Sequence, residues 1–351
     1  MGPFMDVLHL SGVAFIETIQ RQFKGQSELM LFLSHLGDPR AAFLFYFPLL
    51  YCLHNSVGKR VIWVAAISEW LNAVLKWILY GHRPYWWVKI TDLYGISPPH
   101  LDQFRLTCET GPGSPSGHAM VTASVWYIII SSLLHYKLGQ GAHSRLWKMI
   151  GWSFFAAFLF TVNVSRCFIA THFPHQVIFG TAVGIMVAVI FSRISTHDMT
   201  LIHHVLVGVF LLVSASGQFW IFNVLGLDPA WTLPLAQKWC AQSAWVHLDT
   251  TPFAALVRDV GALFGLGMAI KMEKEFKECN IVRTAISLPL SLALCQGSDY
   301  VKGPQGSILV FYAFTFIKFL LLPFLVVAVI PKIGDFWAKQ MARCSSQKKN
   351  G

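Results

Sequence analysis

Residues 113–136 read GSPSGHAMVTASVWYIIISSLLHY, a turn of glycine, proline and serine that runs directly into an apolar stretch. A helix that crosses a bilayer needs about 20 mostly apolar residues, and this stretch supplies them. Ser116 is a favourable N-cap, Gly117 lets a ligand approach the backbone, and His118 falls in the first turn. A helix N-terminus carries free N–H groups that favour phosphate. The stretch predicts a membrane helix that begins at an anion site, although the tetrapeptide alone is more often a simple turn with a structural histidine.

The rest of the chain has the composition of a membrane protein. Hydrophobic residues fill 55% of its 351 positions, charged residues fill 13%, and the mean hydropathy is +0.54. A soluble domain carries about 25% charged residues, so the composition excludes a soluble, a disordered or a nucleic-acid-coating protein, and no nucleic-acid partner is expected. We expect an all-α, polytopic integral membrane protein with one domain over residues 1–351. Nine runs are long enough to be transmembrane helices: 28–53, 58–80, 117–136, 146–166, 174–193, 203–225, 252–270, 281–297 and 307–331.

Two of these nine runs are irregular. The sequence GDPR at positions 37–40 interrupts the first, so we expect either a kink there or a span that begins after Pro39. The eighth, 281–297, is short and has polar ends.

The basic residues predict the orientation of the chain. Nine spans place the termini on opposite sides of the membrane, and 15 of the 27 Lys and Arg residues lie in or beside the loops on the C-terminal side, against seven on the other side. The positive-inside rule makes the segment 1–27 lumenal and the tail 332–351 cytosolic. The chain ends in Lys348-Lys349-Asn350-Gly351, which looks like a dilysine retrieval signal for the endoplasmic reticulum. Two lysines in a polar tail also arise by chance.

Two more blocks place ionisable residues at the ends of spans, where such residues are costly and are functional candidates. Lys76 and Arg83 are seven residues apart, which is two helical turns, so both project the same way from the end of the second span. Arg166 ends the fourth span, and His172 precedes a helix that Pro174 can open. Snorkelling explains Lys76 or Arg83 taken singly, and a structural role explains the other block taken alone.

Together the blocks form an ordered pattern, namely Lys-x6-Arg-Pro, Pro-Ser-Gly-His and Ser-Arg-x5-His, all on the non-cytosolic side. With this pattern the sequence resembles the superfamily of type-2 phosphatidic acid phosphatases and vanadium haloperoxidases. Over nearly the whole chain it resembles the catalytic subunits of the glucose-6-phosphatase family, whose liver-type, islet-type and ubiquitous members stay alternatives. The segments that carry this closer resemblance are 70–72, 76–79, 83–88, 108–120, 170–177 and 249–254.

The resemblance implies a phosphohydrolase of gluconeogenesis that converts glucose 6-phosphate to glucose and phosphate at the lumenal face of the endoplasmic reticulum membrane. It makes His172 the nucleophile that forms a phosphohistidine, and His118 the general acid and then the base. The groups that it implies for phosphate binding are Lys76, Arg83, Arg166, the Ser116 hydroxyl and the Gly117 N–H. The implied partners are the sugar phosphate, membrane lipid and a glucose 6-phosphate transporter.

The chemistry is also consistent with the residue types alone. Imidazoles titrate near neutrality, so one histidine can attack while another donates a proton. Three fixed cations and a helix N-terminus can stabilise a phosphoryl transition state as magnesium does elsewhere, so we expect no metal and no cofactor.

Position 176 departs from the superfamily pattern. The third block of that superfamily runs His-x3-Asp, whereas Gln176 stands at the matching position here. A glutamine carbonyl can accept a ring N–H but carries no charge. Either Gln176 orients His172, or a carboxylate such as Glu109 or Asp38 reaches the site.

Two further features lie outside these blocks. Of the seven cysteines, only Cys108 and Cys240 lie in the longer non-cytosolic loops, where a disulfide is possible, but free thiols are expected. The aromatic run Tyr85-Trp86-Trp87 could stack on a sugar, yet we interpret it as part of an interfacial aromatic belt.

Three rival functions follow from the same residues. A lipid phosphate phosphatase would use the same groups on a substrate that enters from the bilayer. A phosphate or sugar-phosphate transporter would bind the anion without chemistry. A structural membrane protein would carry the blocks as relics.

Overall fold

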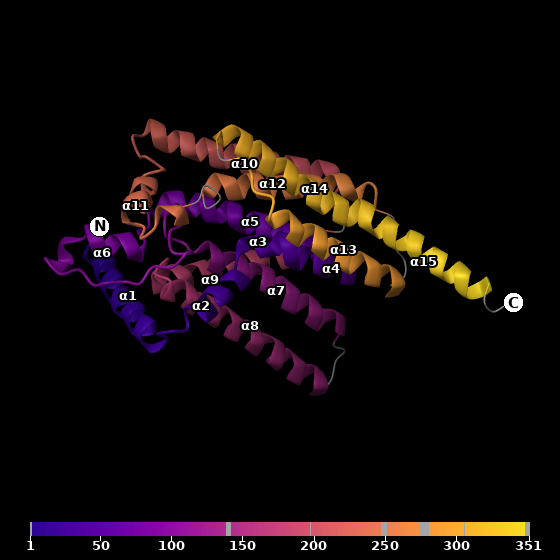
Figure 1. Ribbon diagram of the computed structural model, residues 1–351, viewed down its shortest axis with the longest axis horizontal. Helices are drawn as coiled ribbons and strands as arrows, with labels where there is room; N and C mark the ends of the chain where they lie inside the picture. Colours follow the sequence, from indigo (N-terminus) through magenta and orange to yellow (C-terminus); the bar gives the residue numbers. More distant parts are fainter. Residues whose placement is uncertain are drawn as a thin grey trace. The chain divides into compact units, whose positions relative to one another are not determined.

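The computed structural model describes residues 2–137, 142–196, 198–246, 251–273, 281–304 and 306–347, which form helices and no strand (Figure 1). The all-α prediction is confirmed for these residues, whereas the dilysine end lies outside them. In chain order the α-helices are α1 (Pro3–Gln22), α2 (Ser27–Leu36), α3 (Pro39–Ala41), α4 (Phe47–Leu53), α5 (Asn55–Leu79), α6 (Pro84–Ile90), α7 (Gly117–Lys137), α8 (Ala142–Phe168), α9 (Pro174–Ser192), α10 (Leu201–Val224), α11 (Thr232–Trp239), α12 (Pro252–Ile270), α13 (Ile281–Asp299), α14 (Ile308–Phe324) and α15 (Ile330–Gln347). Short 3-10 or π segments are η1 (Ala42–Tyr46), η2 (Asp92–Tyr94), η3 (Ser243–Trp245) and η5 (Leu325–Val329).

Seven helical segments of the described chain are long and apolar enough to cross a membrane, and each overlaps a predicted span. They are Asn55–Tyr94, Gly117–His135, Ser144–Phe168, Pro174–Ser192, Leu201–Val224, Pro252–Ile270 and Ile308–Met341. The run 28–53 is divided as expected, because α2 ends at Leu36 and a shorter apolar helix covers Pro39–Leu53. The run 281–297 is helix α13, which is not among the seven. The structure is therefore consistent with a polytopic membrane protein, but the count of nine spans is not confirmed.

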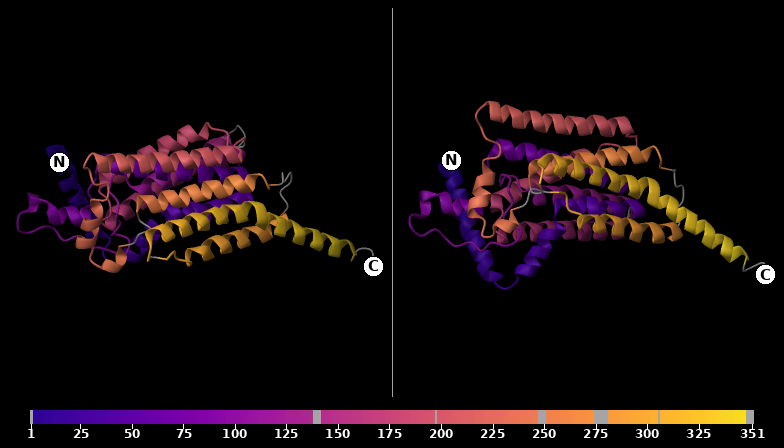
Figure 2. Two further views of the ribbon diagram at one scale, coloured as in Figure 1. Left: turned by 90° about the horizontal axis from the view of Figure 1, so that it is seen from above. Right: turned by 45° about the horizontal axis from the view of Figure 1, so that its top comes forward.

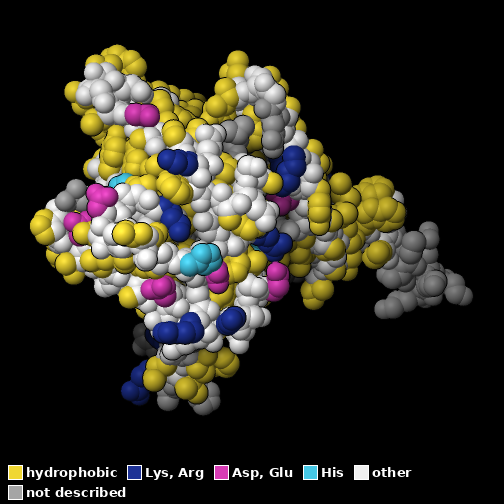
Figure 3. Space-filling model, turned by 60° about the vertical axis from the view of Figure 1, so that its left-hand side comes forward, with side chains coloured by type: hydrophobic (Ala, Val, Ile, Leu, Met, Phe, Trp, Pro, Cys, Tyr) yellow, Lys and Arg dark blue, Asp and Glu magenta, His cyan; other side chains and the backbone are white. Residues whose placement is uncertain are grey.

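The surfaces of these helices carry large exposed apolar side chains. Phe160 of α8 is 69% exposed and Ile178 of α9 is 67% exposed. Figure 3 shows hydrophobic side chains over much of one face of the molecule. Soluble proteins rarely expose so much apolar surface to water. In a membrane, lipid chains would contact these side chains instead of water.

The described residues form two compact units, of which the first comprises residues 2–39, 67–193 and 213–256. Within it α7 packs against α9 and α8, as Figure 1 shows, and α2 packs against α8. Glycines make the close approach of α7 and α9 possible. A Cβ at Gly180 would lie 2.6 Å from the Ser116 carbonyl oxygen, and one at Gly184 would clash with the Met120 carbonyl.

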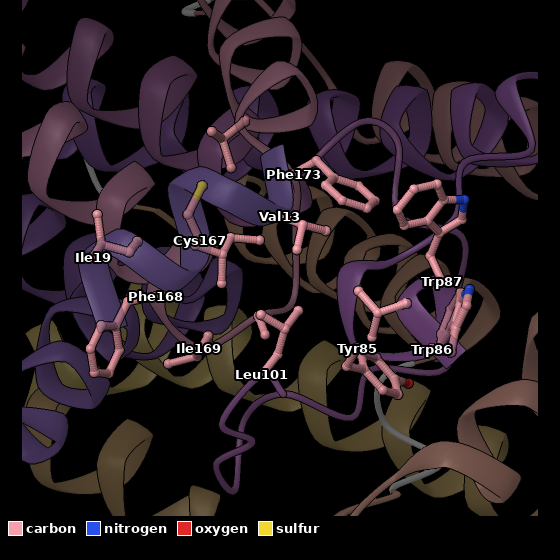
Figure 4. Close-up of a cluster of buried hydrophobic side chains, with 14 of the residues drawn as sticks. Val13, Ile19, Tyr85, Trp86, Trp87, Leu101, Cys167, Phe168, Ile169 and Phe173 are labelled. Atoms are coloured by element: carbon pink, nitrogen blue, oxygen red, sulfur yellow. The ribbon is translucent and has the colours of Figure 1, made fainter. Parts of the chain in front are cut away.

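The main apolar cluster of this unit contains the aromatic run of α6 (Figure 4). Tyr85, Trp86 and Trp87 are at most 2% exposed and belong to the same cluster as Val13 and Phe173. Helices α1 and α11 both contact α6. The interpretation of this run as an interfacial belt is therefore wrong, because neighbouring elements bury the rings in a protein core.

The second unit comprises the described residues of 40–66, 194–212 and 257–351. In this unit α13 packs against α4 and α15. A Cβ at Gly261 of α12 would lie 2.6 Å from the Phe316 carbonyl oxygen, so a glycine permits the contact between α12 and α14. Figure 2 shows α14 continuing through η5 into α15 as one long helix.

Candidate active site

Arg83 is held in place by backbone carbonyl groups. It is the extended N-cap residue of α6, and its side chain is completely buried. The guanidinium donates hydrogen bonds to the carbonyls of Gly111 (Nε, 2.7 Å), Pro112 (Nη2, 3.2 Å) and Thr171 (Nη1, 3.3 Å). A single cation therefore links all three sequence blocks.

The loop that carries the second block lies against the first block. The N–H of Gly113 donates to the carbonyl oxygen of Gly81 over 2.7 Å. A Cβ at position 113 would clash with the carbonyl oxygen of His82, so only glycine fits there. This close approach brings the loop within reach of the Arg83 guanidinium.

Ser116 is the N-cap of α7, as predicted. Its Oγ accepts a hydrogen bond from the N–H of Ala119 over 3.4 Å, and its own N–H donates to the carbonyl of Gln176 over 3.1 Å. His118 lies in the first turn and is 15% exposed. The N-termini of α7 and α9 are thereby joined. The roles of the Ser116 hydroxyl and the Gly117 N–H in phosphate binding stay predictions.

His172 lies in the tight connection between α8 and α9. Ala170 has a left-handed φ of 54°, which is costly for a residue with a Cβ, and the N–H of His172 donates back to the Arg166 carbonyl over 3.4 Å. The ring Nδ1 lies 2.8 Å from the carbonyl oxygen of Gly113. A carbonyl can only accept, so Nδ1 carries the proton and Nε2 keeps its lone pair. Nε2 lies 3.4 Å from Nη1 of Arg83.

Arg166 and Lys76 bring two more cations to this place. Nη1 of Arg166 donates to Oγ of Ser34 over 2.8 Å, and the side chain is buried. Lys76 is 8% exposed, and a Cβ at Gly111 would lie 3.7 Å from its ammonium nitrogen. Lys76 therefore lies beside the loop to which Arg83 is bonded. We call Lys76, Arg83, His118, Arg166 and His172 the cationic cup.

Glu109 provides the anion of the cationic cup. Its Oε2 lies 3.0 Å from Nη1 of Arg83 and 3.8 Å from Nε2 of His172. Its Oε1 pairs with Nη2 of Arg166 and lies 3.6 Å from Nδ1 of His118. One carboxylate therefore reaches four of the five predicted side chains.

The charges of the cup set the protonation of Glu109 and His172. Burial opposes ionisation of the Glu109 carboxyl, but Arg166 and Arg83 outweigh it and hold its pKa well below the usual 4.5. Burial, followed by the charge of Arg83, lowers the pKa of His172 well below 6.5. Near neutral pH the site thus holds an ionised carboxylate and a neutral imidazole, which is the nucleophilic form.

Gln176 does not orient the ring of His172. The Gln176 side chain accepts a hydrogen bond from the N–H of Phe173 over 3.1 Å and donates to the carbonyl of His82 over 2.7 Å. The first suggestion from the sequence is wrong, because Gln176 fixes the backbone on both sides of the site while the Gly113 carbonyl orients the ring.

Sequence reasoning underestimated Glu109, which it offered only as a guess for orienting the nucleophile. The signal was present, because Glu109 is the only carboxylate of the second block, and a site built from several buried cations requires a counter-charge. Its actual partners are the two arginines.

Cys108 and Cys240 form a disulfide, with their Cα atoms 5.8 Å apart. The expectation of free thiols for this pair is therefore wrong. Helix α11 ends at Cys240 and brings it against the loop, and the hydroxyl of Thr232 at the start of α11 donates to the Thr110 carbonyl over 2.6 Å. Helix α11 is thus attached on both sides of Glu109.

The geometry suits a nucleophilic attack on a phosphate monoester. Among the described residues, no group of three His, Cys, Asp or Glu side chains is arranged to hold a metal ion. A neutral imidazole faces a position surrounded by two arginines and a second histidine, which supplies a nucleophile, charge stabilisation and a proton donor.

Comparisons with known proteins agree with this chemistry. Residues 58–200 match the model of the PAP2 superfamily. The chain is 42% identical to glucose-6-phosphatase 2 of Mus musculus, over 93% of this chain and 96% of that protein. It is 40% identical to glucose-6-phosphatase catalytic subunit 1 of Canis lupus familiaris (94% and 96% covered) and 38% identical to glucose-6-phosphatase 3 of Bos taurus (95% and 96% covered). No solved structure gives a significant match.

Proposed function

Because this chain belongs to the glucose-6-phosphatase family of the PAP2 superfamily and is a phosphomonoester hydrolase, we propose that it hydrolyses glucose 6-phosphate through a phosphohistidine on His172. The observation that carries the proposal is the position of Nε2 of His172. Nε2 is unprotonated because the ring proton is on Nδ1, which is bonded to Gly113, and Nε2 lies 3.4 Å from Nη1 of the buried Arg83.

In the first step, Nε2 of His172 attacks the phosphorus, the N–P bond forms and the bond from phosphorus to the sugar oxygen breaks. Arg83, Arg166 and Lys76 stabilise the charge on the non-bridging oxygens, together with the N-terminus of α7. Protonated His118 donates its proton to the departing sugar oxygen, so that neutral glucose leaves.

In the second step, His118 is neutral and acts as the base. It takes a proton from a water molecule, whose oxygen attacks phosphorus while the N–P bond breaks. Inorganic phosphate leaves, His172 regains its lone pair and His118 is again protonated. The proposed cycle consumes one water and returns both histidines to their starting forms.

We place the site at the lumenal face of the endoplasmic reticulum membrane, with the N-terminus lumenal and the C-terminus cytosolic. The support is the excess of Lys and Arg in loops on the C-terminal side. With that orientation, glucose 6-phosphate made in the cytosol reaches the site only through a transporter, which is the proposed partner. Glycosylation sequons inserted at residue 98 and at residue 345 test the orientation, since only the first should be modified.

Phosphate release by purified protein in detergent tests the function. We expect release from glucose 6-phosphate by the wild type, a 32P-labelled acid-labile phosphoenzyme, and neither with His172→Ala. A preference for phosphatidic acid over glucose 6-phosphate would instead favour a lipid phosphatase. Turnover in detergent, where no compartment is sealed, excludes transport as the sole activity.

A further inference from the structure

The carboxylate of Glu109 lies where the proposed function needs the phosphoryl group. Its two oxygens face Arg83 and Arg166, its Oε2 is 3.8 Å from the nucleophilic Nε2 of His172, and its Oε1 is 3.6 Å from His118. The proposed reaction requires the same four neighbours around phosphorus. The carboxylate and a bound phosphoryl group would therefore compete for one position.

The two buried arginines account for the position of the carboxylate. The Arg83 and Arg166 side chains are at most 1% exposed. An isolated buried cation is strongly unfavourable, so a protein that buries two of them needs an anion between them. Glu109 supplies one negative charge, and a phosphate monoester supplies up to two at the same place.

We propose that the Glu109 carboxylate occupies the phosphoryl position and pairs with the two arginines until substrate binds. The carboxylate leaves the arginines when substrate enters, and it returns to them when phosphate departs. The inference rests on the proposed function and adds a residue that sets the affinity for the anion. Because substrate must replace existing ion pairs, its net binding energy is reduced by the cost of breaking them. Glu109 thereby weakens the binding of the product phosphate as well, which favours its release.

The surroundings restrict this exchange to the side chain. Cys108 is tied to Cys240 by the disulfide, and the Thr110 carbonyl accepts the hydrogen bond from Thr232. The carbonyl of Glu109 itself accepts a hydrogen bond from the Tyr85 hydroxyl over 3.2 Å. The backbone is therefore held at three consecutive residues.

The Glu109 side chain is partly accessible to solvent. It is 16% exposed, whereas the arginine side chains that it contacts are essentially inaccessible. Rotation about its side-chain bonds can move the carboxylate toward solvent without moving the loop. It can then stay close enough to His118 to support the proton that His118 must donate.

Binding of inorganic phosphate to purified, detergent-solubilised protein tests the exchange. We compare the wild type, Glu109→Gln and the matched control Glu17→Gln, which removes the same charge from an exposed position on α1. Isothermal titration calorimetry gives the dissociation constant, and thermal unfolding with and without phosphate gives an independent readout. We expect Glu109→Gln to bind phosphate at least about tenfold more tightly than the wild type, because no ion pair has to be broken. Glu17→Gln should match the wild type.

The alternative is that Glu109 stays beside the arginines and positions them in every state. Phosphate binding by Glu109→Gln that is unchanged or weaker, in a wild type that hydrolyses glucose 6-phosphate, overturns the exchange and leaves the proposed function intact. A wild type that neither hydrolyses sugar phosphates nor binds phosphate overturns the proposed function itself. If Glu109→Gln does not fold, a structure of the wild type with vanadate decides, because a carboxylate still paired with both arginines beside the bound anion contradicts the proposal.

Discussion

The ring Nδ1 of His172 and the carbonyl oxygen of Gly113 are 2.8 Å apart, which joins the proposed nucleophile to the loop of the second block. This bond fixes which ring nitrogen is free to attack. Gly113 also donates its N–H to Gly81. One glycine therefore connects the first block to His172 in the third block.

Gly113→Ala should disable catalysis while the protein remains folded. The added Cβ clashes with the His82 carbonyl and comes within 3.0 Å of the Gln176 amide, so the loop must shift and carry the Gly113 carbonyl with it. A displacement near 1 Å lowers kcat roughly hundredfold. The control is Gly217→Ala, since a Cβ there meets no atom within 4 Å. Steady-state kinetics on glucose 6-phosphate measure both, and a Gly113→Ala enzyme with wild-type kcat would contradict the role of this carbonyl.

His172 should remain neutral under mildly acidic conditions. Burial and then the charge of Arg83 lower its pKa well below 6.5, so the free nitrogen persists as the pH falls through that value. The folded state favours the neutral ring, so the contribution of His172 to the free energy of unfolding is present above pH 6.5 and is lost as the pH falls. Nitrogen NMR of 15N-histidine-labelled protein, assigned with His172→Asn, measures the titration. A His172 midpoint near 6.5 is the contradicting result.

Gln176→Glu should destabilise the site even though it restores an acid near the superfamily position. The glutamine amide donates to the His82 carbonyl over 2.7 Å, and an ionised carboxylate cannot donate, so two acceptors would face each other. Loss of such a buried hydrogen bond costs about 1–3 kcal/mol. Thermal unfolding should show a lower midpoint, and kcat should fall with it. An increase in kcat would show instead that an acid at this position improves the nucleophile.

Loss of the Cys108–Cys240 disulfide should lower both stability and activity. The bond closes a long loop, and breaking such a bond removes about 2–4 kcal/mol from the free energy of unfolding. It also frees one of the two attachments of α11 beside Glu109, so kcat/KM should fall several-fold. Cys108→Ser is compared with Cys52→Ser, which alters a free cysteine. Unfolding midpoints and kinetics that are identical for the two variants would contradict a role for α11 in holding the loop.

Local sequence signals predicted the seven long apolar helices and the helix ends at which the candidate site residues lie, and they failed where distant segments meet. The N-cap at Ser116 and the helix opened by Pro174 follow from short-range preferences. The burial of Trp86 and the pairing of Cys108 with Cys240 depend on α1 and α11, which are far away in the sequence. Periodicity and composition contain no information about such neighbours.

The same limit explains the two residues whose roles were misjudged. Gln176 was compared with the superfamily aspartate because of its spacing from His172. Its side chain instead bonds the carbonyl of His82 in the first block and the N–H of Phe173 at the start of α9. Glu109 has no distinguishing spacing at all. Its pairing with Arg83 and Arg166 follows from the convergence of these side chains in space, which no local pattern encodes.

The three carbonyls that hold Arg83 make its placement independent of side-chain chemistry at positions 111, 112 and 171. Every amino acid has a backbone carbonyl oxygen. A substitution at these positions is therefore tolerated when the new residue can adopt the required backbone torsion angles and fit the available space. Arg83 itself has no comparable latitude, since its three bonds leave from different nitrogens of one rigid plane and a lysine would satisfy only part of the set. We therefore expect position 83 to stay arginine in related sequences, whereas positions 111, 112 and 171 should accept any residue that fits the backbone conformation and the space.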